Sequence, residues 1–487
     1  MGLAMRNETP QAIFLKDYKP VPYVVEKIEL DFSLASENTR VTSRISMRPN
    51  PLSNEKIAPL VFDGEKIKLI SVNIDGVALG VDRFAITDSQ LIIATVPQKS
   101  FTLSIVTECN PLGNTALSGL YMSNGMYCTQ CEAQGFRRIT YFYDRPDVMA
   151  IFKVRMDAPN TMPVLLSNGN AGESGPQGSD RHFAVWDDPH PKPSYLFALV
   201  AGDLASVHDH FTTMNGRKVH LGIYVEKGKE DRCDWAMESL KASMRWDETV
   251  FGREYDLDVF NIVAVSDFNM GAMENKGLNV FNDKYILALP ETATDTDFMS
   301  IEAIIAHEYF HNWTGNRITC RDWFQLCLKE GLTVFRDQEF TSDMRSRSVK
   351  RIQDVKTLQA RQFPEDQVPL SHPARPSSYI EINNFYTPTV YEKGAEICRM
   401  MKTLIGEAAF RKAMDLYFDR HDGDAATVED FVRCMADASG RNLDQFFKWY
   451  EQAGTPSCRS KYKSIALRNA ASPISVFIMR QISAPFS

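Results

Sequence analysis

The sequence lacks any hydrophobic run long enough to cross a membrane. Its most apolar internal stretch, residues 195–201, is far shorter than the roughly 20 residues that a spanning helix needs. The first 20 residues meet charge and proline before any apolar run, so we expect no signal peptide. A myristoylation signal is also missing, because position 6 is Arg rather than Ser or Thr. We therefore expect a cytoplasmic protein with no membrane partner.

An excess of positive charge and a regular cysteine pattern are missing too. The chain has 54 Lys and Arg against 62 Asp and Glu, a formal net charge of −8, which argues against nucleic acid as a partner. Its nine cysteines have no regular spacing, so we expect reduced thiols rather than a disulfide framework. Cys128 and Cys131 form one CxxC pair, but no second pair stands at zinc-finger spacing, which favours free thiols.

The chain is long enough for two or three domains, each with its own core. Of its 487 residues, 44% are hydrophobic and 24% are charged, which is ordinary for a globular protein and excludes disorder or a coiled coil as the main feature. Short β-branched runs separated by Gly, Asn, Asp and Pro predict an antiparallel β domain over residues 1–205. Within this domain, the polar stretch 167–180 is predicted to be a turn region.

Helical periodicity dominates the second part of the chain. Residues 231–252 repeat apolar side chains at helical spacing, and most segments from Asp297 onward are predicted as helices. One of these begins with Thr427 as its N-cap and ends at Gly440. We therefore predict a second, mostly helical domain over residues 206–455.

The strongest motif for chemistry is His307-Glu308-Tyr309-Phe310-His311. Two histidines four residues apart on a helix project from one face and can bind one metal ion. Glu308 lies beside that face, where it can act as the general base for an attacking water. Neutral imidazoles suit zinc, whose catalytic sites have three protein ligands and one open position. The alternative is a pair of surface histidines on an ordinary helix.

A third ligand is available in the next apolar segment. Glu330 follows His311 by eighteen residues, in the run WFQLCLKEGLTVF, whose many apolar side chains indicate a mostly buried helix. Asp337 lies two turns further along the same face and could orient a zinc-binding histidine. A solvated Glu and a plain surface Asp are the alternatives.

At this point the sequence resembles a known family. The spacing of HExxH and Glu330 is that of the gluzincins, and Gly271-Ala272-Met273-Glu274-Asn275 is similar to the exopeptidase signature of the aminopeptidase N family. Together with QCEAQGFR and NNFYTPTVYEKGAE, these motifs resemble the bacterial branch of that family from about residue 15 to about residue 456. The resemblance implies an α+β multidomain fold, in which an antiparallel, saddle-like β domain precedes a thermolysin-like, mostly helical catalytic domain. It also implies one Zn²⁺ per chain, held by His307, His311 and Glu330.

The chemistry of an exopeptidase requires recognition of a free ammonium group. A carboxylate at a fixed distance from the metal provides it, and Glu274 can supply one from an extended segment that could pair with substrate as an added strand. The resemblance assigns a second carboxylate to Glu132 and stabilisation of the oxyanion to Tyr391. It assigns the remaining substrate contacts to Gln130, Met270, Gly271, Ala272, Met273, Asn275, Asn383 and Tyr386. A Met-containing pocket wall is consistent with broad specificity.

We therefore expect a zinc-dependent metalloaminopeptidase in the class called membrane alanyl aminopeptidase. The resemblance implies peptide substrates with a free N-terminus and a preference for Ala and other neutral or basic residues, and we expect a monomer. A related gluzincin with another reaction, such as epoxide hydrolysis, is one alternative. A truncated product of the same family that binds zinc or peptide with little or no activity is the other.

Residues 456–487 and Ala303 depart from the family pattern. Ala303, one turn before His307, stands where bacterial members carry Arg, which removes a polar contact there. From Pro456 to Ser487 there are five Lys and Arg and no acidic residue. Family members continue at this point into a β-sandwich and a large helical domain, which this segment does not resemble. We expect it to be a remnant or a frameshifted start of a missing third domain.

Overall fold

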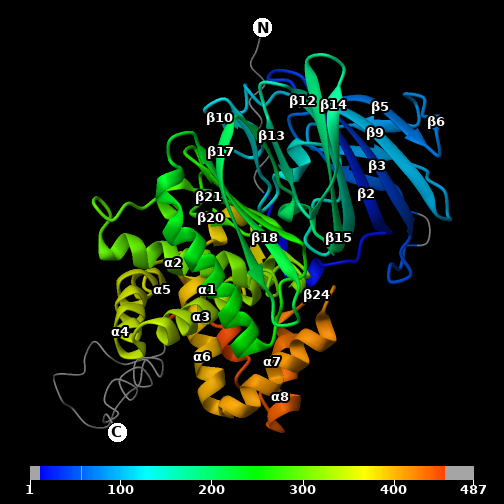
Figure 1. Ribbon diagram of the computed structural model, residues 1–487. Coiled ribbons are helices and arrows are strands. Elements are labelled where there is room, and N and C mark those ends of the chain that lie inside the picture. Colours follow the sequence, from blue (N-terminus) through cyan, green and yellow to red (C-terminus); the bar gives the residue numbers. More distant parts are fainter. Residues whose placement is uncertain (1–10, 56–57, 456–487) are drawn as a thin grey trace, which may run out of the picture.

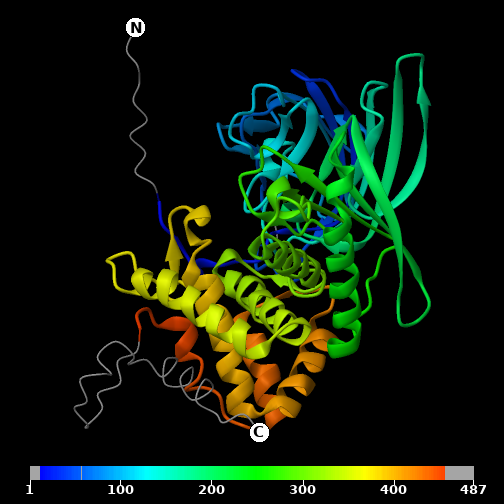
Figure 2. The ribbon, with the colours of Figure 1, turned by 60° about the vertical axis from the view of Figure 1, so that its left-hand side comes forward.

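A computed structural model of the chain describes residues 11–55 and 58–455 (Figure 1). The first part of this range is built from strands and the last part from helices, and Figure 2 shows the sheets at the top and the helices at the bottom. The predicted tail, residues 456–487, lies outside the described residues.

Eight strands of the N-terminal part form one large sheet in the order β14-β15-β12-β2-β3-β9-β5-β6. Their bounds are β2 (Tyr23–Ser33), β3 (Thr39–Pro49), β5 (Lys68–Ile74), β6 (Val77–Ala78), β9 (Phe101–Cys109), β12 (Ala150–Pro159), β14 (Asn170–Gln177) and β15 (Arg181–Lys192). Burial alternates along β3 and β9, as expected when one face packs on the core. The neighbouring strands pair antiparallel as predicted, except that β2 and β12 are parallel.

Residues 167–180 do not form the predicted turn region. Their middle is strand β14, which pairs with β15 at the edge of the large sheet and is interrupted by a register shift between Ala171 and Ser174. Most of its side chains are exposed, so it carries no alternating apolar pattern. Glycine and proline are tolerated in this strand because it lies at the edge of the sheet.

Smaller sheets complete the N-terminal part. One has the order β4-β8-β7, from β4 (Leu60–Asp63), β7 (Phe84–Ile86) and β8 (Gln90–Ile93). Another has the order β10-β11-β16-β13, from β10 (Gly119–Ser123), β11 (Met126–Gln130), β13 (Val164–Ser167) and β16 (Leu199–Gly202). A third pairs β1 (Ile13–Phe14) with β23 (Ser378–Tyr379), which ties the first described strand to the helical part.

A five-stranded sheet opens the second part, in the order β17-β18-β19-β21-β20. Its strands are β17 (Leu204–Thr212), β18 (Lys218–Glu226), β19 (Val259–Val265), β20 (Ala272–Met273) and β21 (Leu278–Asn282). The chain passes from one sheet to another between β16 and β17, near the boundary predicted at residue 205. The short strand β20 forms an edge of this sheet.

Helices make up most of the rest. They are α1 (Asp234–Phe251), α2 (Asp295–Phe310), α3 (Leu326–Met344), α4 (Arg347–Thr357), α5 (Phe363–Asp366), α6 (Gly394–Ile405), α7 (Glu407–His421), α8 (Val428–Ser439) and α9 (Lys448–Glu451). The short strands β22 (Thr319–Cys320) and β24 (Ala425–Ala426) pair between them. The predicted limits of α8 are confirmed, since Thr427 caps its start and Gly440 ends it in the left-handed conformation. Among the described residues, no helix is both long enough and apolar enough to cross a membrane.

Helix α3 lies at the centre of the helical part and is buried along nearly its whole length. It packs against α2, α4 and α6. A Cβ added to Gly331 would lie 2.7 Å from the Cα of Gly394, so only glycine permits this close approach. The contact brings the segment before α6, which carries Tyr391, against the part of α3 that carries Glu330.

Candidate active site

The two motif histidines and Glu330 meet where α2 packs on α3. His307 lies in the last turn of α2, His311 directly follows the helix, and Glu330 lies in the second turn of α3. The distance from His307 Nε2 to His311 Nε2 is 3.0 Å, and Glu330 Oε2 is 3.4 Å and 3.3 Å from these two atoms. The predicted ligands are thus brought together by two helices.

This donor set fits a tetrahedral metal ion. Ligand atoms 2.0–2.1 Å from a tetrahedral zinc ion lie about 3.3–3.4 Å apart, close to the separations of these three atoms. Burial by itself would raise the pKa of Glu330, but Lys329 and the two imidazoles hold that pKa well below its usual range. A buried, ionised carboxylate beside two imidazoles is a chemically suitable set for zinc.

Hydrogen bonds on the far side of each ring orient the two histidines. His307 Nδ1 lies 2.8 Å from Asp337 Oδ2, and His311 Nδ1 lies 2.8 Å from the carbonyl oxygen of Thr314. Because both Nδ1 atoms face acceptors, they carry the protons and leave the Nε2 lone pairs for a metal. Asp337 therefore lies where the sequence placed it, behind the first histidine of the motif.

The end of α2 is held by a residue that the sequence did not indicate. Arg336, fully buried in α3, donates hydrogen bonds to the carbonyl oxygen of Phe310 at 2.8 Å and to Thr314 Oγ1 at 3.2 Å. It also pairs with Asp247 of α1. A cation at a helix C-terminus satisfies its free carbonyls and complements its dipole, which fixes the turn that carries His311.

Glu308 lies in the same cavity, with 7% of its surface exposed. Burial is the largest influence on its pKa and raises it well above the usual range for a carboxyl group. A raised pKa suits a residue that takes a proton from water and later returns it.

Two more carboxylates enter the cavity from other elements. Glu274 follows β20, and its backbone carbonyl accepts a hydrogen bond of 2.9 Å from Asn316 Nδ2. Glu132 follows β11 in the N-terminal part, and its Oε1 accepts a hydrogen bond of 3.0 Å from the Tyr386 hydroxyl. The site is thus assembled from both halves of the chain.

Lys329 joins these carboxylates. Its Nζ lies 2.8 Å from Glu132 Oε1, 2.7 Å from Glu274 Oε1 and 2.5 Å from Glu330 Oε1, and its side chain is 1% exposed. Such burial of a lysine is rare unless it is paired. The motifs of the sequence did not point to Lys329, although a lone Lys in the apolar run LCLKEGL is a signal for it.

A cavity of about 400 Å³ connects these groups. Eleven of the predicted site residues line it, namely Glu132, Met270, Gly271, Ala272, Glu274, His307, Glu308, His311, Glu330, Tyr386 and Tyr391. Tyr391 stacks beside the predicted metal ligands, with its ring centroid 6.4 Å from that of His307. Asp337, Ala303, Ile304 and Val334 also line the cavity, so the departure at Ala303 falls on its wall.

Four predicted residues lie outside the cavity lining. Gln130 and Met273 are buried against each other, with Gln130 Nε2 3.8 Å from Met273 Sδ. Asn275 is buried, and neither polar atom of its side chain has a hydrogen-bond partner among the described residues. Asn383 is exposed, and its amide donates to the carboxylate of Glu381 at 2.7 Å.

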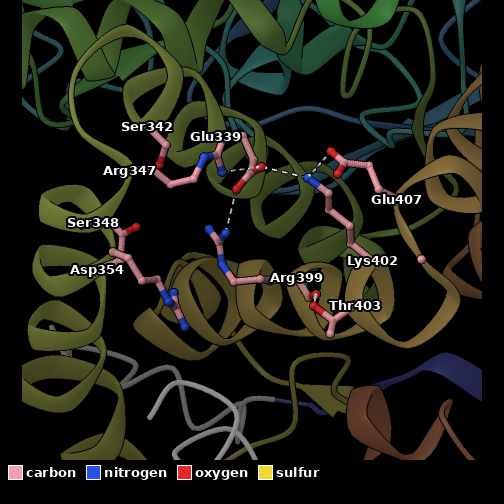
Figure 3. Close-up of a pocket in the computed structure, with 11 residues that line it drawn as sticks. Glu339, Ser342, Arg347, Ser348, Asp354, Arg399, Lys402, Thr403 and Glu407 are labelled. Atoms are coloured by element: carbon pink, nitrogen blue, oxygen red, sulfur yellow. Dashed lines mark hydrogen bonds and ion pairs between the residues drawn. The ribbon is translucent and has the colours of Figure 1, made fainter. Parts of the chain in front are cut away.

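A larger cavity of about 570 Å³ lies between α3, α4 and α6, where Figure 3 shows its lining side chains. Its charges pair with one another: Glu339 accepts from Arg399 at 2.7 Å and from Lys402 at 2.9 Å. Lys402 also lies 3.2 Å from Glu407. With its cations already paired, this cavity is a weaker candidate than the cavity at the HExxH motif.

Comparisons with known proteins place the chain in a family. The family models "Peptidase M1 N-terminal domain" and "Peptidase family M1 domain" match residues 19–196 and 235–450. Aminopeptidase N of Caulobacter vibrioides is 59% identical over 453 residues, which are 93% of this chain and 52% of that protein. Aminopeptidase N of Escherichia coli is 55% identical over 92% of this chain and 51% of that protein.

A solved structure is similar as well. The crystal structure of Legionella pneumophila aminopeptidase A in complex with aspartic acid is 36% identical, with a TM-score of 0.87 over 92% of this chain and 51% of that chain. This likeness supports the predicted order of a β-rich part followed by a helical part. The chain spans about half the length of the curated relatives it matches. Two family models that together cover most of the chain, and relatives above 50% identity, show that the chain belongs to peptidase family M1.

Proposed function

We propose that this chain is a zinc-dependent aminopeptidase that removes the N-terminal residue from peptides. The observation that carries the proposal is a single cavity that joins a zinc-suited donor set to two carboxylates, Glu132 and Glu274. Carboxylates at a fixed distance from the metal restrict cleavage to the first peptide bond, because they bind the free ammonium group. The names of the similar proteins point to the same activity.

Each residue then has a defined part. His307, His311 and Glu330 would hold the ion, and a bound zinc ion would polarise the carbonyl group of the scissile bond. Glu308 takes the proton of the attacking water and delivers it to the departing amine. The Tyr391 hydroxyl donates a hydrogen bond to the oxyanion that develops on the substrate.

The substrate is positioned by its amine and its backbone. Glu132 and Glu274 accept hydrogen bonds from the ammonium group, and the edge strand β20 aligns the peptide as an added strand. Met270 forms part of the wall for the first side chain, and its flexible thioether accepts side chains of different shape.

We further propose one zinc ion per chain and activity as a monomer. The preferred first residues are Ala and other neutral or basic ones, as in the membrane alanyl aminopeptidase class. The eight cysteines of the described residues are unpaired thiols, which supports a reducing compartment such as the cytoplasm.

The test gives the zinc-loaded chain an alanine-initiated peptide, either with a free N-terminus or with an acetylated one. Mass spectrometry identifies the products. The proposal predicts release of alanine from the free peptide and no cleavage of its N-acetylated form. Internal cleavage of both forms would contradict it. Zinc uptake without hydrolysis of either form would favour the alternative of a zinc-binding or peptide-binding family member without activity.

A further inference from the structure

Three of the nine histidines lie together on the β17–β18 hairpin, outside the active-site cavity (Figure 1). His208 and His210 belong to β17, and His220 belongs to β18. In the antiparallel register His210 lies opposite His220, and His208 lies opposite Gly222. Side chains two residues apart, and side chains of directly paired residues, share one face of a sheet. All three imidazoles therefore project from the same face.

This face is remote from the proposed chemistry and open to solvent. Asp209, between the two β17 histidines, pairs with Lys241 of α1, so the histidines lie on the face turned away from α1. His208 and His210 are exposed, and His220 is partly buried. Strand β17 forms one edge of the five-stranded sheet, whereas β20, with its active-site motif, forms the opposite edge.

Two of the imidazoles, those of His208 and His220, are close enough to share one ion. His208 Nδ1 lies 3.0 Å from His220 Nε2, and the two ring centroids are 4.9 Å apart. Two nitrogen ligands 2.0–2.1 Å from a tetrahedral or square-planar ion lie about 2.8–3.4 Å apart. The His210 ring centroid is 5.2 Å from that of His220, so its imidazole would join the same ion after a rotation about its exposed side-chain bonds.

The inner side of the cluster holds an oxygen atom without a partner. A Cβ at Gly222 would lie 2.7 Å from Asn261 Oδ1, 2.9 Å from Tyr224 Cε2 and 3.4 Å from His208 Nδ1, so the glycine lets Asn261 and His208 lie close to β18. Asn261 is 2% exposed, and its Oδ1 has no hydrogen-bond partner within the described part of the chain. A buried polar atom without a partner costs about 1–3 kcal/mol. A water molecule coordinated to an ion at this point would satisfy it.

We propose that His208, His210 and His220 form a second metal site, which takes a borderline transition-metal ion such as Ni²⁺ or Cu²⁺ and has Asn261 at its inner side. The ion would bind both strands of the hairpin at the free edge of the sheet. The competing explanation is a simple hydrogen bond between two neutral imidazoles.

The test is a titration with NiCl₂ of the protein that already holds one equivalent of zinc. Calorimetry measures the binding of Ni²⁺. The expected result is one further equivalent of bound Ni²⁺ and unchanged peptidase activity. His208→Ala and His220→Ala should each weaken this binding at least tenfold, and His210→Ala should weaken it severalfold. His182→Ala is the matched control, because His182 is a partly buried β15 histidine whose ring lies 2.8 Å from the Met162 carbonyl oxygen.

Circular dichroism without nickel should show all four variants folded, since none of the four side chains is fully buried. Absence of a further equivalent in the unmodified protein would overturn the proposal. Unchanged Ni²⁺ affinity in His208→Ala or His220→Ala would overturn it too, because the ion would then bind elsewhere. Unchanged affinity in His210→Ala would contradict the three-histidine site.

Discussion

Replacement of Lys329 by Met tests how the proposed amine site balances its charge. The Lys329 ammonium contacts Glu132, Glu274 and Glu330 at 2.5–2.8 Å in a buried position. Removing one partner of a buried ion pair costs about 3–5 kcal/mol of stability, because the remaining charges lose their compensation. We expect a lower unfolding free energy by about this amount in the Lys329→Met variant.

Substrate binding should weaken as well. Burial is the largest influence on the pKa of Glu132 and raises it, Lys329 opposes this effect, and Glu274 adds to it. Without Lys329, the two neighbouring carboxylates would share a proton, so only one remains ionised to bind the substrate ammonium. We expect KM for an alanyl anilide to rise about tenfold, which corresponds to about 1.4 kcal/mol. Because the pKa is raised, part of this carboxylate pair stays protonated near neutral pH. As the pH rises the pair ionises and binds the substrate ammonium more tightly, so KM of the variant should fall.

The assay measures KM and kcat from pH 6.5 to 9 at a temperature at which the variant is folded, together with its zinc content. Lys192→Met is the matched control, because Lys192 is also fully buried, lies 3.0 Å from Asp188 and does not line the cavity. It should lose stability but keep its KM. An unchanged KM in Lys329→Met with unchanged zinc content would refute the reasoning.

Three further substitutions give separate predictions. Glu308→Gln should keep its zinc and lower kcat by about 10²–10⁴-fold, as measured by metal analysis and anilide hydrolysis, because the general base is lost. Asp337→Asn should weaken zinc affinity about 10–100-fold in competition with a chelator, because the hydrogen bond that orients His307 is weakened. Burial by itself would raise the pKa of Glu339, but Arg399, Lys402 and Arg347 lower it to about 2. Its stabilising contribution is therefore present above the unfolded value near 4.5 and is lost as the pH falls toward 2. Denaturant unfolding of Glu339→Gln should show a loss of about 2–3 kcal/mol at pH 7 that shrinks below pH 4, whereas Glu407→Gln, an exposed partner of the same Lys402, should change little.

Local sequence patterns predicted the parts of the fold that depend on neighbouring residues. Helix α8 begins and ends where its capping residues predicted, because capping is a matter of adjacent backbone groups. The meeting of His307 and His311 on one face was predicted by helical spacing, and their Nε2 atoms lie 3.0 Å apart. The parallel pairing of β2 with β12 was not predictable in this way, since it joins strands more than a hundred residues apart and leaves no periodic signal.

Three features of the structure were not predicted from neighbouring residues, each for a physical reason. Strand β14 is exposed at an edge, so no buried face imposes the alternation from which strands are predicted. Glu132 was indicated only through the family resemblance, because nothing in its neighbours shows that it faces α3. Arg336 reads as an ordinary charged residue in the sequence, and only the packed helices show that it holds the end of α2.

The most direct test of the central claim is a zinc titration of the metal-free chain, followed by release of alanine from an alanine-initiated peptide. The account predicts that activity is absent without zinc, rises in proportion to added zinc and reaches its full value at one equivalent per chain. Activity that does not depend on zinc, or no activity with one equivalent bound, would contradict the proposal that His307, His311 and Glu330 hold a catalytic zinc ion.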